Sequence, residues 1–89
     1  MEVRRLVAWN IRRHRVLRGL SQEALAVDAQ IDRTYVSSLE RGLENPTVVV
    51  LDKLAVALSI PIAELLRVPP RGEAAPKPLK AGRRRLKAT

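Results

Sequence analysis

The sequence predicts a small all-α fold followed by a basic tail. Apolar residues recur at the spacing of amphipathic helices, and alternating runs of strand-forming residues are scarce. Helix-capping residues punctuate these segments: Ser21, Asp32 and Thr47 precede apolar-periodic stretches, and Gly19 and Gly42 follow them. A chain of 89 residues is long enough for one domain with a modest core.

The first helix is expected over residues 3–18. Leu6, Ile11 and Arg15 are predicted to face inward on its apolar side. The same helix carries the only tryptophan of the chain, Trp9. Its large ring suits an anchor at the edge of the core or a small contact patch, and stacking on DNA is not expected.

Two short helices joined by a tight corner are expected between residues 20 and 42. Leu25 and Ala26 give the first of them an apolar face. The second is expected over residues 33–41. Asp32 suits its start, because a carboxylate accepts hydrogen bonds from orphan amides and interacts favourably with the positive end of a helix.

The helix expected over residues 33–41 has two chemically different faces. On a wheel of about 100° per residue, Val36 and Leu39 centre one face, with Tyr35 and Glu40 at its margins. The opposite face carries guanidinium and hydroxyl groups from Arg33, Thr34, Ser37, Ser38 and Arg41. Such groups suit base edges and phosphates in a DNA major groove. An ordinary solvated face also favours small polar residues, so this helix alone leaves both interpretations open.

The wider pattern resembles the helix-turn-helix of phage repressors and Cro, the XRE family. The matching segments read L-S-Q-E-x-L-A, D-R-T-Y-V-S-x-L-E-R-G and N-P-T, and D-R-T-Y-V-S looks most like the controller proteins of restriction–modification systems. The resemblance covers about residues 3–66. It implies the lambda-repressor-like fold of five α-helices, with the second and third forming the DNA reader.

The resemblance also implies a set of DNA contacts. Arg33, in the first turn of the third helix, suits a guanine through bonds to O6 and N7, and Thr34 and Ser38 suit base edges. Tyr35 lies at the rim, where a phosphate or a base is within reach. Gln22 resembles a family position that contacts the backbone or orients the third helix. The full expected set is Gln22, Arg33, Thr34, Tyr35, Ser37, Ser38, Arg41 and Asn45.

Three further positions follow from the resemblance. Arg15 and Glu40 match residues that form a structural ion pair in the repressors, and a guanidinium can meet a carboxylate through two parallel bonds. Gln30 stands in the corner where relatives usually place Gly, because the backbone there has a positive φ. Either Gln30 tolerates a conformation that costs roughly 1 kcal/mol, or the corner is reshaped.

A fourth helix is expected over residues 48–58 and a short fifth over residues 62–66. The fourth has an inward stripe of Leu51, Leu54, Ala55 and Leu58. Apolar surface in excess of the core's needs often marks an interface, and here it comes from Val56, Ile60, Ile62 and Leu66. In the resembling regulators this region forms a two-fold dimer, so a homodimer is expected. The alternative is a monomer covered by its C-terminal tail.

The net charge of +8 lies mostly in the C-terminal segment. Residues 1–68, the expected domain, hold ten Lys/Arg against eight Asp/Glu, whereas residues 69–89 hold seven against one. Pro, Gly, Ala and basic residues replace the apolar periodicity after residue 68, which predicts a disordered tail. Its basic cluster at residues 83–87 suits phosphates without sequence readout. A solubilising tail without a partner is the alternative.

Composition argues against several other functions. The chain has no Cys, so disulfides and thiolate metal sites are excluded. The single histidine, His14, is expected to be packed or half-buried rather than a ligand. There is no nucleophile–base set, metal set or phosphate-cradling Gly loop, so no enzyme, cofactor or small-molecule ligand is expected. No apolar run reaches the roughly 20 residues of a membrane span, and no signal peptide is recognisable, which predicts a cytoplasmic protein. The resemblance implies a prokaryotic one.

These observations predict a regulator of transcription that binds double-stranded DNA. A homodimer is expected to place two third helices in successive major grooves, about 34 Å apart, on a palindromic operator. The alternative is an antitoxin or another protein-interaction module, for which operator binding is a second role and the tail wraps a partner.

Overall fold

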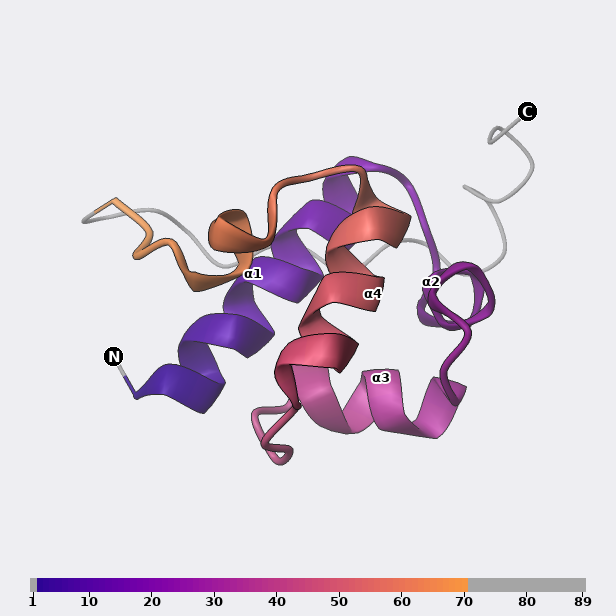
Figure 1. Cartoon of the computed structure of the whole chain (residues 1–89), viewed down its shortest axis with the longest axis horizontal. Coiled ribbons are helices and arrows are strands. Elements are labelled where there is room, and N and C mark those ends of the chain that lie inside the picture. Colours follow the sequence, from indigo (N-terminus) through magenta and orange to yellow (C-terminus); the bar gives the residue numbers. More distant parts are fainter. Residues whose placement is uncertain (1, 71–89) are drawn as a thin grey trace.

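The computed structural model describes residues 2–70, and these residues form four α-helices, one 3-10 helix and no strand. The elements are α1 (Val3–Leu17), α2 (Gln22–Ala29), α3 (Arg33–Glu40), α4 (Val48–Leu58) and the 3-10 helix η1 (Ile62–Leu66). α1 packs against α3, α4 and η1, and α2 packs against α3 and α4. In Figure 1, α4 lies in front of α1, α3 runs below it, and α2 is seen nearly end-on at one side.

The predicted caps define where the helices begin. Ser21, Asp32 and Thr47 each accept a hydrogen bond from a backbone amide of the following turn, at 3.0, 3.2 and 3.1 Å respectively. Such bonds satisfy amides that have no partner inside the helix. After α3, Gly42 adopts φ 74°, a left-handed conformation that suits glycine at the end of a helix.

The last element is a 3-10 helix, so the prediction of a fifth α-helix is wrong in type. The carbonyl of Pro61 accepts a bond from the amide three residues later, at 2.9 Å. Tight turns of this kind are common in short segments. Buried Asn10 of α1 holds the segment in place, because its Nδ2 donates to the carbonyls of Leu65 and Arg67 at 3.0 and 2.9 Å.

The corner between α2 and α3 keeps the left-handed backbone, with Gln30 at φ 60° and ψ 45°. Of the two alternatives, therefore, Gln30 tolerates the conformation and the corner is not reshaped around it. The amide of Ile31 bonds to the carbonyl of Ala26 at 3.0 Å and closes the end of α2. Ser59 ends α4 in the same way, at φ 58°.

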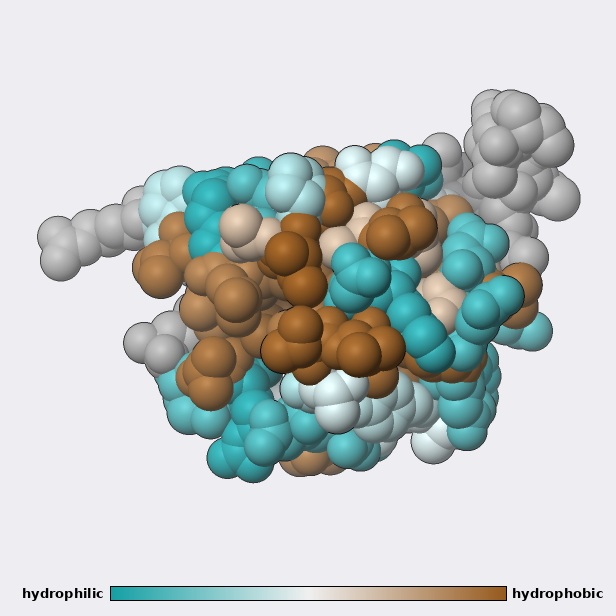
Figure 2. All heavy atoms as spheres, in the orientation of Figure 1, coloured by the Kyte–Doolittle hydropathy of each residue, from teal (hydrophilic) through white to brown (hydrophobic). Residues whose placement is uncertain are grey.

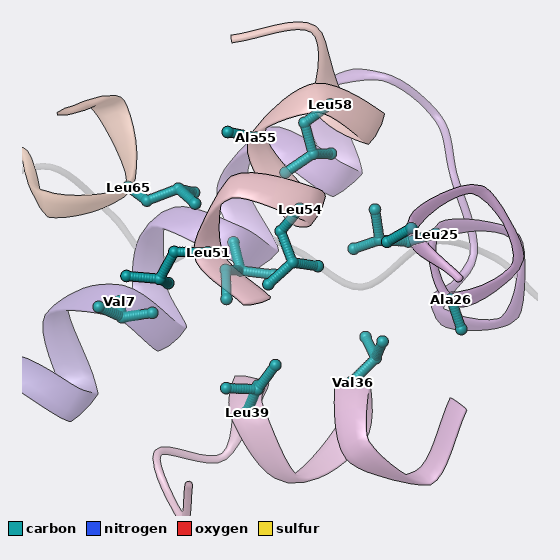
Figure 3. Close-up of a cluster of buried hydrophobic side chains, with 12 residues drawn as sticks. Val7, Leu25, Ala26, Val36, Leu39, Leu51, Leu54, Ala55, Leu58 and Leu65 are labelled. Atoms are coloured by element: carbon teal, nitrogen blue, oxygen red, sulfur yellow. The ribbon is translucent and has the colours of Figure 1, made fainter. Parts of the chain in front are cut away.

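The core lies where all five elements meet, and Figure 3 shows their side chains converging on its centre. The largest fully buried side chains are Ile11, Leu25, Val36, Leu39, Leu54, Leu58 and Leu65. The stripe predicted for α4 is buried throughout. Val36 and Leu39 are the only buried residues of α3, so the opposite face of this helix is accessible to solvent.

Candidate nucleic-acid interface

The polar face of α3 points away from the core. Val36 and Leu39 project from α3 toward the other helices (Figure 3). On the opposite side the residues are accessible: Arg33, Thr34 and Arg41 are exposed, and Ser37 and Ser38 are half-buried. A row of Arg and hydroxyl groups therefore lies along the outside of a helix whose inner side is anchored. The expected DNA contacts on α3 share one accessible surface.

At the N-terminal end of α3, Asp32 caps the helix and does not pair with the neighbouring Arg33. The Asp32 carboxylate accepts a hydrogen bond from the Thr34 amide at 3.2 Å. Arg33 forms no ion pair with any residue between 2 and 70. Because no ion pair or side-chain hydrogen bond to the described residues holds the Arg33 guanidinium, its five N–H donors are available to an external acceptor such as guanine O6 and N7.

Tyr35 sits at the rim between the core and the outer face. Its ring is half-buried and packs against the core cluster. Burial raises the pKa of the Tyr35 phenol above its ordinary value, and the negative charge of Glu44 raises it further. The hydroxyl therefore stays protonated at neutral pH and can donate a hydrogen bond, for example to a phosphate oxygen.

A buried ion pair holds α3 to α1. Arg15 and Glu40 meet through two parallel bonds, Nε to Oε2 at 2.5 Å and Nη2 to Oε1 at 2.9 Å. Their side chains are only 7% and 4% exposed. The remaining Arg15 donor Nη1 bonds the carbonyl of Leu20 at 2.8 Å, and Gln22 Nε2 donates to Glu40 Oε1 at 3.2 Å. The cluster thus joins the ends of α1, α2 and α3, and half-buried Gln22 links the start of α2 to the end of α3.

The C-terminal end of α3 adjoins a cation that the sequence patterns did not single out. Arg41 and Asn45 are exposed there, on either side of the turn that Gly42 begins. Arg5, from the first turn of α1, lies beside this turn: its Cγ is 3.6 Å from the place where a Cβ on Gly42 would lie. Arg5 is itself exposed. Arg5 and Gly42 are far apart along the chain, so no local sequence pattern could predict that they lie close together.

The residues expected at a dimer interface divide into two groups. Val56, Ile62 and Leu66 are exposed, at 70%, 36% and 46% of their surface. Ile60 instead packs partly against the domain's own core, because the left-handed turn after α4 directs its amide back to the Ala55 carbonyl at 3.0 Å. Ile60 is therefore less accessible than the other three, and its place at a dimer interface stays a prediction. Figure 2 shows apolar residues gathered over α4 and the segment that follows it.

His14 is half-buried against η1, and its Nε2 lies 3.6 Å from Glu64 Oε1. Burial lowers the pKa of this imidazole below its ordinary value, and the charge of Glu64 partly opposes that effect.

No group of three or more His, Cys, Asp or Glu side chains among the described residues is arranged to hold a metal. None of the described helices has the length and apolarity that crossing a membrane requires. From residue 71 onward, the predicted disordered tail with its basic cluster lies outside the described residues.

A short helix held by a cap and a buried ion pair, with a polar outer face and a tight corner before it, defines a helix-turn-helix domain. The chain matches the helix-turn-helix family over residues 11–65 and belongs to it. The family is of the repressor/Cro, or XRE, type, and its members similar to this chain include DNA-binding regulators of transcription and restriction–modification controller proteins.

Particular relatives support this assignment. An uncharacterized HTH-type transcriptional regulator of Sinorhizobium fredii, y4dJ, is 44% identical over 66 residues, which cover 74% of this chain and 86% of the relative. The crystal structure of the hypothetical transcription factor NHTF from Neisseria superimposes with a TM-score of 0.75 at 41% identity, covering 76% and 78% of the two chains. The controller protein C.AhdI from Aeromonas hydrophila gives 0.68 at 42% identity, covering 70% of this chain and 94% of its own.

Proposed function

We propose that the protein is a sequence-specific regulator of transcription that binds a palindromic operator as a homodimer. The observation that carries the proposal is the outer face of α3, where Arg33, Thr34 and Ser38 are accessible and opposite the buried Val36 and Leu39. Membership of the helix-turn-helix family supports DNA as the partner of this face.

The N-terminal part of α3 reads bases in this proposal. A bidentate contact from Arg33 to guanine discriminates against other bases by about 1–3 kcal/mol. Thr34 and Ser38 lie along the same face, one and five residues further, and bond neighbouring base edges. Tyr35 donates its hydroxyl at the rim.

Phosphate contacts flank the bases and set the orientation of the domain. The amides at the start of α2 face one strand, because a helix N-terminus attracts anions. Arg41 and Asn45 hold the backbone at the far end of α3, and Arg5 adds a charge there. Such contacts position the protein and carry no sequence information directly.

The homodimer rests on the exposed apolar surface of Val56, Ile62 and Leu66. A two-fold dimer places two copies of α3 about 34 Å apart, one turn of DNA, so its site is an inverted repeat. Each half-site alone offers half of the contacts, and the dimer therefore binds far more tightly than a monomer does.

Selection of bound duplexes from a random pool by the full-length protein tests the proposal. We expect enrichment of one sequence with two inverted half-sites centred one helical turn apart. A matched selection with the double variant Arg33→Ala, Ser38→Ala is expected to lose that preference. Enrichment of no shared sequence by the unaltered protein would overturn sequence-specific recognition, and an unrepeated site would overturn the dimeric mode.

A further inference from the structure

We propose that the outer face of α1 binds the chain's own C-terminal segment through the carboxylate of Glu73. In this contact Glu73 accepts hydrogen bonds from the indole of Trp9 and the guanidinium of Arg12, and it holds the segment on the side of α1 that faces away from the core. The inference stands independently of DNA binding, and it assigns an occupant to a surface that the proposed function leaves unused.

The outer face of α1 lies opposite the buried residues of this helix. On a wheel of about 100° per residue, Arg5, Trp9 and Arg12 fall within an arc of about 60°. Val7 and Ile11, which are buried, lie on the other side. Trp9 and Arg12 are half-buried and Arg5 is exposed. Because α1 contains no Asp or Glu, this face carries cations and no carboxylate from its own helix.

Two hydrogen-bond donors on this face have no acceptor. Trp9 Nε1 and Arg12 Nε are both buried, and neither has a hydrogen-bond partner. Arg12 also forms no ion pair with any residue in the described range. Residues three apart are neighbours on the surface of a helix, so the two N–H groups belong to one place. Since buried polar groups are rarely left unpaired, the pair requires an acceptor that residues 2–70 do not provide.

The described part of the chain ends beside this face. Asn10, next to Trp9 in the sequence, donates its Nδ2 to the carbonyl of Arg67 at 2.9 Å, which places residue 67 against α1. Glu73 follows six residues later, and six residues span at most about 20 Å. A helix with its side chains is about 10–12 Å across. Glu73 is therefore within reach of the outer side of α1.

The chemistry of the segment selects this residue. Glu73 is the only acidic residue after residue 70. Its two oxygens can accept both unpaired N–H groups at once, whereas Lys and Arg side chains can only donate. Hydrogen bonds to a charged acceptor are stronger than those between neutral groups, and partial burial strengthens them further. Position and charge therefore favour Glu73 as the missing acceptor.

The contact determines the path of the segment. Val56, Ile62 and Leu66 are exposed on α4 and η1, and both elements pack on the inner side of α1. A segment held at Trp9 leaves this apolar surface open to a second copy, in contrast to the monomer covered by its tail. The basic cluster at residues 83–87 begins ten residues beyond Glu73, a span of up to about 33 Å, and keeps its reach toward phosphates.

The indole N–H of Trp9 tests the contact in the full-length protein, because a single tryptophan gives a single NMR signal. Glu73→Ala removes the acceptor, so hydrogen exchange of this N–H should become about fivefold faster or more, as the loss of a bond to a charged group implies. Acrylamide should also quench Trp9 fluorescence more strongly. Glu73→Asp keeps a carboxylate and should retain most of the protection. Lys77→Ala, which alters a charge of the same segment, is the matched control and should change neither measurement.

A double-variant comparison identifies the second donor. Arg12→Ala should weaken the contact and speed the exchange, and adding Glu73→Ala to it should have little further effect, because both changes remove the same interaction. Circular dichroism should show unchanged helix content, since Arg12 lies on the outer face and Glu73 lies beyond the described fold.

Equal exchange in Glu73→Ala and the unaltered protein would overturn the contact. Protection of the indole that instead increases with protein concentration would assign this face to a second copy, and protection that appears only with added duplex DNA would assign it to phosphates. Either result would also overturn the Glu73 contact. Operator selection and dimerisation are measured separately and depend on α3 and on the apolar surface of α4 and η1, so failure of this contact leaves the proposed function in place.

Discussion

The outer faces of α3 and α4 have opposite chemistry although both helices bury a stripe of branched apolar residues. On α3 the exposed side carries Arg and hydroxyl groups and no carboxylate between Arg33 and Ser38. On α4 it carries valines that frame one acid and one base. Folding requires only the buried stripes. The contrast between the outer faces therefore matches the two partners proposed above, DNA at α3 and a second copy of the chain beside α4.

The two helices also differ in what holds them. α3 is eight residues long and relies on a cap together with the buried Arg15–Glu40 pair. α4 is eleven residues long and packs through Leu51, Leu54 and Leu58. A buried ion pair positions α3, the helix proposed to face DNA, through directional bonds, whereas apolar packing suffices for the helix expected at the dimer interface.

The largest expected effect comes from removing the support of α3. Glu40→Ala leaves the Arg15 guanidinium buried without its carboxylate, which should cost about 3–5 kcal/mol of unfolding free energy. Denaturant unfolding followed by circular dichroism measures this cost. Glu2→Ala, which removes the exposed pair with Arg4, serves as the control and should leave the midpoint in place. Equal stability of Glu40→Ala and the unaltered protein would show that the pair contributes nothing.

A charge on the apolar side should separate the protomers. Ile62→Glu places a carboxylate where it must lose water on association, and it should weaken the dimer by at least about 2 kcal/mol. Sedimentation should detect a folded monomer with strongly reduced operator affinity. Val27→Glu alters a valine of α2 with 70% exposure, and it should leave the dimer intact. If Ile62→Glu remains dimeric, the interface lies elsewhere, for instance around Trp9.

A smaller effect is expected on the polar side. Arg33→Ala should reduce affinity for the best site by about 1–3 kcal/mol and relax preference at one position in each half-site. Stability should change by less than about 0.5 kcal/mol, because the side chain is exposed. Arg41→Ala should instead weaken binding to all sequences alike and lower the salt slope by about 0.9. Titrations on the best site and its guanine variants separate these patterns, and equal losses for Arg33→Ala on every variant would make Arg33 a backbone contact.

The smallest effect is expected at His14, between α1 and η1. Because burial lowers its pKa in the folded protein, the unfolded chain binds the proton more readily. The stability that neutral His14 provides is therefore present above about pH 6.5, its ordinary pKa, and is lost as the pH falls below it. Unfolding free energies between pH 7.5 and 5.5 should decline less in His14→Gln than in the unaltered protein. Identical slopes would assign the decline to other groups.

Much of the fold was predictable because its signals act over a few residues. The caps Ser21, Asp32 and Thr47 bond amides two or three positions away, and the buried stripe of α4 repeats within a turn. The boundaries of α1 and α3 agree with the structure to within one residue. The apolar and polar faces of α3 could be assigned on the same basis, since a helix of known register determines which side chains share a side.

The remaining features depend on where distant segments meet. Asn10 stabilises η1 across more than fifty residues, Arg5 reaches the turn at Gly42, and Ile60 is partly buried against the core. Local periodicity carries no information about such contacts, because it specifies which side of a helix is apolar but not which neighbour will cover it. Helix positions and faces were therefore available from the sequence, whereas the type of the last helix, the cation beside α3 and the extent of the exposed apolar surface were set by tertiary packing.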